Sequence, residues 1–111
     1  MERMDFAAIE LRTMRQAWRA LEGRWELTWR ECRELLPAGG ADDENPPRDT
    51  ETRMRILIQV GHRVGIPGPK LHDWLRSPVA TLGWLTPLDV MSGGLGELRG
   101  FRALVEQGFA S

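Results

Sequence analysis

The sequence predicts an all-α protein built from about six short helices. Apolar residues recur at intervals of three and four through most of the chain, and no segment alternates between apolar and polar residues as a half-buried strand does. Threonine caps, prolines and glycines divide this pattern into short segments. The 111 residues, 41% of them hydrophobic and 28% charged, fit one folded domain or two small parts that share a core.

The N-terminal part contains two of these helices. Asp5 can cap the first helix, and Gly23 is placed where it would end it. In the second helix, Thr28 and Glu31 have the spacing of a capping box, in which each side chain satisfies a backbone amide beside the other. Pro37 ends that helix. Its buried face is expected to consist of Trp29, Cys32, Leu35 and Leu36.

The segment 37–48, PAGGADDENPPR, separates two parts of the chain. It combines glycines, prolines and acidic residues without any period, which predicts a loop. We therefore assign residues 1–48 to an N-terminal helical part that includes this acidic loop, and residues 49–111 to a C-terminal helical part packed against it. The third helix is expected to begin with Asp49 or Thr50 as its cap. Its buried face is expected at Met54, Leu57, Ile58, Gly61 and Val64.

The C-terminal part continues with three more helices. Pro69 fits the first turn of a short fourth helix, which Pro78 ends before the compact turn VATLGWL. Thr86 as a cap, with Pro87 at the first helical position, predicts a fifth helix of barely two turns. The sixth helix is expected over about residues 95–107. Glycine then ends it at position 108, before a three-residue tail.

Charge is distributed unevenly along a chain whose net charge is -1. Residues 37–52 carry five acids and one arginine, a net -4, and residues 53–76 carry five basic residues and one acid, a net +4. The overall balance does not predict a nucleic-acid-binding protein. The basic residues of the second segment form either an exposed patch or an ordinary solvated helix face, and the solvated face is the simpler interpretation. They are Arg53, Arg55, Arg63, Lys70 and Arg76.

The sequence contains no membrane or export signal. No apolar run reaches 18 residues, and the N-terminal MERMDFAAIELR contains acids where a signal peptide has a long apolar segment. Cys32 is the single cysteine, so no intrachain disulfide can form, which fits a reducing compartment. We therefore expect a cytoplasmic protein that does not span a membrane.

Catalysis has little support in the sequence. His62 and His72 have no metal-ligand partner at a recognised spacing, and Cys32 lies on an apolar stripe. The glycine-rich stretch GGLGELRG (93–100) follows no strand and does not match a dinucleotide fingerprint. We therefore expect no enzyme activity, no metal and no cofactor.

Binding to DNA and binding to protein remain as alternatives. WELTWRECRELL resembles the first half of a helix-turn-helix, but the acidic loop stands where the recognition helix would follow, which argues against DNA binding. Five tryptophans are many for a chain of this size to bury, and tryptophan is enriched at interfaces. We expect one or two of them at a partner or dimer interface.

A family resemblance enters at WLRSPVATLGWLTPLDVMSGG and the helix after it. The stretch resembles the toxin-binding domain of the Xre/MbcA/ParS class of bacterial antitoxins, whose pattern is Trp-Leu/Met-x-x-Pro-Asn-x-x-Leu/Phe-Gly-Gly-x-Thr/Ser-Pro-Leu-Asp/Glu. The upstream part resembles the family's degenerate helix-turn-helix, so the resemblance covers about residues 18–111. Val79 replaces the family's asparagine and Trp84 its second glycine. The matching positions are Trp74, Leu75, Pro78, Leu82, Gly83, Thr86, Pro87, Leu88, Asp89 and Gly108.

The resemblance implies an antitoxin that binds a RES-domain toxin, an enzyme that destroys NAD, and covers its active site with the C-terminal end. A homodimer is expected. The alternatives are a helix-turn-helix regulator of its own operon and a dimeric interaction protein without a toxin partner. A helix ending at Gly108 could project the tail and its carboxylate toward an anion-binding pocket. Partner contacts are expected from Trp74, Val79, Trp84, Phe101, Gly108, Phe109, Ala110 and Ser111.

Overall fold

The computed structural model describes residues 3–37, 41 and 46–110, and all of its regular structure there is helical apart from one isolated β-bridge. The prediction of an all-α fold is confirmed. The elements are α1 (Arg3–Trp25), α2 (Trp29–Leu35), α3 (Arg48–Arg63), α4 (Gly68–Leu75), the short 3-10 helix η1 (Ala80–Leu82), α5 (Pro87–Met91) and α6 (Leu95–Glu106).

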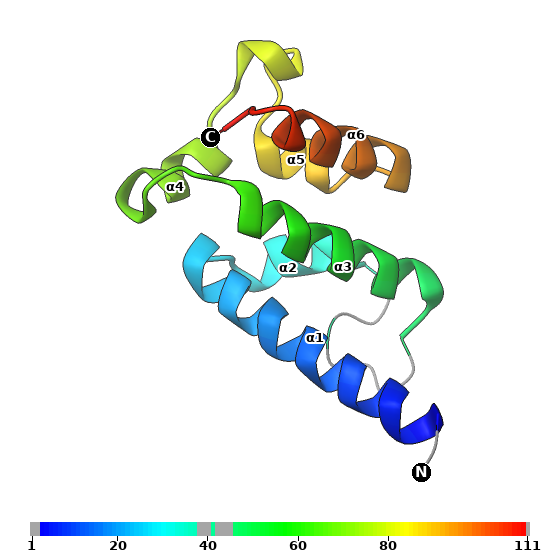
Figure 1. Ribbon diagram of the computed structural model, residues 1–111. Helices are drawn as coiled ribbons and strands as arrows, with labels where there is room; N and C mark the ends of the chain where they lie inside the picture. The colour runs from blue at the N-terminus through cyan, green and yellow to red at the C-terminus, as the bar shows by residue number, and fades with distance from the viewer. Residues whose placement is uncertain (1–2, 38–40, 42–45, 111) are drawn as a thin grey trace.

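The helix α3 lies at the centre of the molecule, with α1 on one side and α6 on the other (Figure 1). The short helix α5 packs against α6, and α4 contacts both α1 and α5. One cluster of buried side chains joins all of the α-helices, so the N-terminal and C-terminal parts share a core. Its largest fully buried members are Trp18, Trp25, Phe101, Leu21, Leu35, Leu36, Met54, Leu57, Leu75, Met91 and Leu98.

The first helix does not end at Gly23, as the sequence predicts. It continues to Trp25, and Glu26 takes the left-handed backbone conformation (φ 51°) that ends it. Leu27 N donates to Glu22 O (3.1 Å) and Glu26 N to Gly23 O (3.3 Å), which is the bonding pattern of a Schellman ending. The extension has a packing reason, because it carries Trp25 into the core.

The second helix begins as predicted, but Trp29, one member of its predicted buried face, is exposed. Glu31 N donates to Thr28 Oγ1 (3.1 Å) and Thr28 N to Glu31 Oε1 (2.9 Å), which confirms the capping box. Trp29, however, is 75% exposed, and the guanidinium of Arg33 lies 5.0 Å from its ring centroid. The helix ends before Leu36, so the buried face is centred on Leu35 and Trp29 points to solvent.

The third helix begins at Arg48 with Pro47 as its cap, and neither Asp49 nor Thr50 caps it. Thr50 is instead buried inside the first turn. The fixed φ of proline suits the start of a helix, and Pro47 has no side chain that could accept a hydrogen bond from the free amides. The cap predicted at Asp5 is also wrong, because α1 begins at Arg3 and Asp5 lies inside it. The start of α5 agrees with its prediction. Thr86 Oγ1 accepts a hydrogen bond from Asp89 N (3.0 Å), and Pro87 opens α5.

Arg53, expected among the surface basic residues, is a buried structural residue with 6% of its surface exposed. Its guanidinium donates to Leu35 O (2.6 Å), Met91 O (2.6 Å) and Gly93 O (2.8 Å). Leu35 and Met91 are the last residues of α2 and α5, whose final carbonyls have no partner within their own helices. Burial lowers the pKa of Arg53, and the negative charge of Asp49 raises it by a smaller amount. One side chain therefore joins three segments of the core.

Candidate functional site

The segment 77–86 between α4 and α5, here called the corner, protrudes from the helical body (Figure 1). It is closed by backbone hydrogen bonds. Val79 N donates to Leu85 O (3.1 Å), and Val79 O accepts from Leu82 N and Trp84 N (both 2.9 Å). Val79 stands where the antitoxin pattern has asparagine, and main-chain hydrogen bonds close the turn here. Val79 itself is half-buried.

The corner contains two consecutive residues with left-handed backbone, Gly83 (φ 67°) and Trp84 (φ 68°). Glycine adopts this conformation readily, but a bulky side chain in it is an outlier. The indole of Trp84 is 69% exposed, and the adjacent Leu85 is 52% exposed. Trp84 and Trp29 are thus exposed tryptophans, and the partner or dimer interface expected for one or two of the five stays a prediction. The exposure of Leu85 was not predicted, because nothing in its local pattern separates it from a core leucine.

The C-terminal residues pack back onto the protein. Phe109 lies between Trp74 (ring centroids 5.9 Å apart) and Phe101 (5.8 Å, edge to face). Gly108 has φ 107° and reverses the chain, and Phe109 N donates to Leu104 O (3.0 Å). The last described contact is from Gly65 N to Ala110 O (2.8 Å).

Two predicted partner contacts need correction in this geometry. Phe101 is 1% exposed, so its ring contacts the core and has no free surface for a partner. Phe109 does not project from the end of α6, because it is half-buried against Trp74 and Phe101. Phe109 packs against these rings and does not project, because burying its apolar ring lowers the free energy of the folded chain. Trp74 is half-buried at the edge of this cluster, and Ser111 lies outside the described residues.

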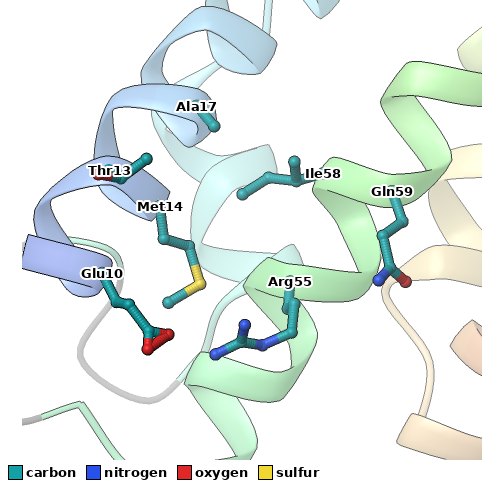
Figure 2. A pocket seen from close by; sticks show the side chains of 7 residues that line it. All are labelled: Glu10, Thr13, Met14, Ala17, Arg55, Ile58 and Gln59. Carbon is teal, nitrogen blue, oxygen red and sulfur yellow. The ribbon is translucent and has the colours of Figure 1, made fainter. Parts of the chain in front are cut away.

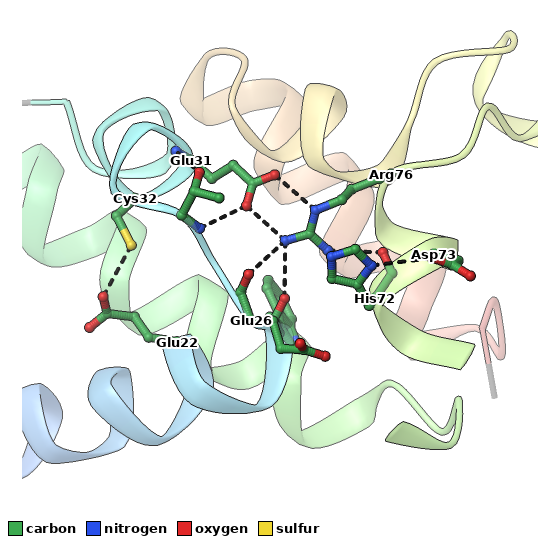
Figure 3. A network of polar contacts seen from close by, with 9 residues as sticks. Glu22, Glu26, Glu31, Cys32, His72, Asp73 and Arg76 are labelled. Carbon is green, nitrogen blue, oxygen red and sulfur yellow. Dashed lines mark hydrogen bonds and ion pairs between the residues drawn. The ribbon is translucent and has the colours of Figure 1, made fainter. Parts of the chain in front are cut away.

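Arg76, at the end of α4, connects the base of the corner to the N-terminal part (Figure 3). Its Nε and Nη2 donate to the two carboxylate oxygens of Glu31 (2.9 and 2.7 Å). Nη1 donates to His72 O (2.9 Å), and Nη2 also donates to Trp25 O (3.2 Å) and Glu26 O (3.0 Å). The carbonyls of Trp25 and Glu26 lie at the C-terminal end of α1, so a single guanidinium joins α1, α2 and α4.

The same network sets the ionisation of Glu31. Burial by itself would raise the pKa of this carboxyl. The hydrogen bonds from Arg76 and from the Thr28 amide, together with the charge of Arg76, outweigh burial and lower the pKa below its ordinary value. The sequence does not predict the ion pair between Arg76 and Glu31, because the two residues lie 45 positions apart in the chain.

Cys32 is partly buried, and its thiol donates a hydrogen bond to Glu22 Oε2 (3.1 Å; Figure 3). Burial, followed by the hydrogen bond and charge of the Glu22 carboxylate, raises the pKa of Cys32 to about 12. The thiolate is the reactive form of cysteine. The thiol is therefore kept in its unreactive form at neutral pH, as the sequence interpretation of a packed cysteine implied.

Labelling of Cys32 by a disulfide reagent at pH 8 is expected to be at least ~100-fold slower in the folded chain than in urea, because so little thiolate is present. Above about pH 9 the unfolded chain loses its thiol proton while the folded chain keeps it, so this group lowers stability as pH rises from there toward 12. Glu22→Gln removes the neighbouring charge and should speed labelling. Equal rates for the folded and unfolded chain would contradict the assignment.

An open pocket of about 400 Å³ lies between α1 and α3 (Figure 2). Its lining is mainly apolar and contains no histidine or cysteine. The residues around it are Glu10, Thr13, Met14, Ala17, Arg55, Ile58 and Gln59. In the described part of the chain, no three His, Cys, Asp or Glu side chains are grouped so that they could hold a metal ion. None of the helices described there is long and apolar enough to cross a membrane.

Comparison with known proteins adds no relative. The chain matches no family model, no curated protein and no solved structure. The corner and the C-terminal end are the features of the molecule that bear on its function.

Proposed function

We propose that this chain is a protein-binding module that acts by occupying a partner's surface and not by catalysis. More particularly, we propose an antitoxin-like protein that binds a RES-domain toxin and blocks its NAD-degrading site. In this proposal it acts as a homodimer in the cytoplasm.

The observation that carries the proposal is the backbone of the corner. The antitoxin pattern has a pair of glycines, and both equivalent positions here, Gly83 and Trp84, have φ near +67°. A left-handed pair is a physical reason for glycine at these positions. The Thr86 cap and Pro87 at the start of α5 supply the next part of the same pattern. The corner of this chain thus has the backbone that the family pattern requires, including the position where the residue differs.

The C-terminal end supports blocking by a preformed surface. Phe109 is held by two aromatic rings, and Ala110 O accepts a hydrogen bond from Gly65 N. Figure 1 shows the last residues that the structure describes near α4, on the side of the molecule from which the corner leaves. A surface that is already ordered loses little conformational entropy when it binds. The toxin is therefore expected to meet a fixed end of α6 together with the corner.

Removal of residues 110–111 tests this role while leaving Phe109 in its aromatic cluster. The shortened chain is expected to stay folded and to inhibit a RES-domain toxin at least ~10-fold less well, a change of about 1.4 kcal/mol. The measurements are NAD consumption in vitro and NAD level with growth in co-expressing cells.

Ala110→Gly is the matched control, because Ala110 has φ 65° and glycine keeps both the backbone and the chain length. It is expected to inhibit as well as the native chain. Full inhibition by the shortened chain would remove the C-terminal end from the mechanism. Failure of the native chain to affect the toxin at all would favour the regulator or the toxin-independent interaction protein.

A further inference from the structure

We propose that Trp84, with Leu85, is the main anchor by which this chain enters an uncharged apolar cleft on its toxin partner. This inference rests on the proposed function and names the side chains that would recognise the toxin. Large apolar side chains that are exposed in the described part of the chain are Trp29, Trp84 and Leu85. Two of these three are therefore neighbours within the corner.

The backbone at Trp84 is unfavourable for the residue that occupies it. A residue with a Cβ atom rarely adopts φ near +68°, and such outliers persist where a function or the surrounding structure requires them. Packing does not supply the reason here, because 69% of the side chain is exposed. Glycine would relieve the backbone without leaving a cavity in the core. The fold alone thus favours glycine at this position, and the indole needs another explanation.

The surroundings of the indole define the chemistry of the partner. Residues 77–88, SPVATLGWLTPL, contain no charged residue in a chain that is 28% charged. Nucleic acid and anionic membrane surfaces bind basic residues, which this segment lacks. An uncharged, apolar cleft in a protein is the surface that fits an indole beside a leucine.

A second copy of the chain is the other protein that could cover the corner, and the small area of the corner's exposed apolar side chains argues against it. A stable dimer buries roughly 800 Å² on each partner, far more than one indole and one leucine provide. A concave site on a different protein gives these side chains a complementary surface.

The main chain presents the anchor in a fixed position. The bridge between Val79 and Leu85, and the hydrogen bond from Trp84 N to Val79 O (2.9 Å), close the turn on both sides of the indole. An anchor that is ordered before binding avoids most of the entropy loss of association. The strain at Trp84 is thus present in the free protein and is compatible with a preformed binding element.

The test compares three variants of the full chain, using a RES-domain toxin that the native chain inhibits as the probe. Trp84→Gly is expected to raise the melting temperature by about 4–8 °C, because it relieves the backbone, and to weaken toxin binding by at least ~100-fold. Trp84→Ala should weaken binding similarly without the gain in melting temperature, since alanine keeps the Cβ atom. Trp29→Ala removes an equally exposed indole outside the corner and should leave binding within about twofold.

Calorimetric titration and thermal unfolding separate the possible outcomes. Native-strength binding by Trp84→Gly would overturn the anchor while leaving the proposed function intact. An unchanged or lower melting temperature for Trp84→Gly would show that the indole stabilises the fold. That result would also overturn the assignment of Trp84 as the anchor. Absence of binding by the native chain would instead overturn the proposed function, and the anchor's assignment to a RES-domain toxin with it.

Discussion

Replacing Arg53 with methionine is expected to lower the free energy of unfolding by about 3–5 kcal/mol. The guanidinium donates to the carbonyls of Leu35, Met91 and Gly93, and methionine fills similar space without donating. A buried acceptor left without a partner costs about 1–3 kcal/mol, so the loss of three donors adds up to a large effect. Urea unfolding followed by circular dichroism measures it.

Arg55→Met is the matched control for this experiment. It makes the same chemical change two residues along α3, at an exposed side chain whose ion pair with Glu51 (3.5 Å) lies in solvent. Exposed pairs of this kind contribute about 0.3–0.5 kcal/mol, so its effect should be small. Arg53→Lys should lie between, because an ammonium group keeps the charge and loses the fork-shaped set of donors. A loss below about 1 kcal/mol for Arg53→Met would mean that water replaces the guanidinium.

Replacing Arg76 with methionine is expected to lower the free energy of unfolding by about 2–3 kcal/mol. The change removes the bidentate pair with Glu31. It also removes the donors to the carbonyls of Trp25 and Glu26 at the C-terminal end of α1, and to the carbonyl of His72 in α4. The effect is smaller than at Arg53 because about a fifth of each side chain in the pair is exposed, so water can partly replace the lost donors. Unfolding in urea, compared for the native chain and both variants, gives this order directly.

The same pair predicts a pH dependence. The folded pKa of Glu31 is lower than its unfolded value, so its stabilising contribution is fully present above roughly pH 4.3. That contribution is lost as pH falls through the lowered folded pKa. In Glu31→Gln this part of the acid sensitivity should disappear, and the double variant with Arg76→Met should show a coupling of about 1–2 kcal/mol at pH 7. Additive effects at pH 7 would contradict the pairing.

Two signals contained within four residues predicted helix starts correctly, whereas α1 and α3 begin before the caps predicted at Asp5 and at Asp49 or Thr50. The pair Thr28 and Glu31 forms its capping box, and Thr86 with Pro87 opens α5, because a capping side chain bonds to an amide three positions away. The end of α1 was predicted two residues too early, because it depends on contacts with distant parts of the chain. Gly23 permits an ending, but the burial of Trp25, which depends on distant helices, favours continuing.

The candidate site was predictable in part. The sequence predicts the corner as a compact turn, and it predicts Trp84 as a partner contact without predicting its exposure. Its strained backbone could be found only in the structure, because φ at Trp84 is set by how the whole turn closes. The docking of Phe109 on Trp74 was likewise beyond the local pattern, since the two rings belong to segments 35 positions apart.

By itself, the sequence determined that the chain is all-helical, where most helices begin, and that the segment before α5 is a rigid turn. These properties depend on apolar period and on capping within one or two turns of helix. Only the tertiary structure decided that Arg53 is buried, that Arg76 meets Glu31, and that Trp29 and Trp84 face solvent. Those outcomes depend on which distant carbonyls and side chains the packed helices bring within a few ångströms, and spacing along the chain does not specify that.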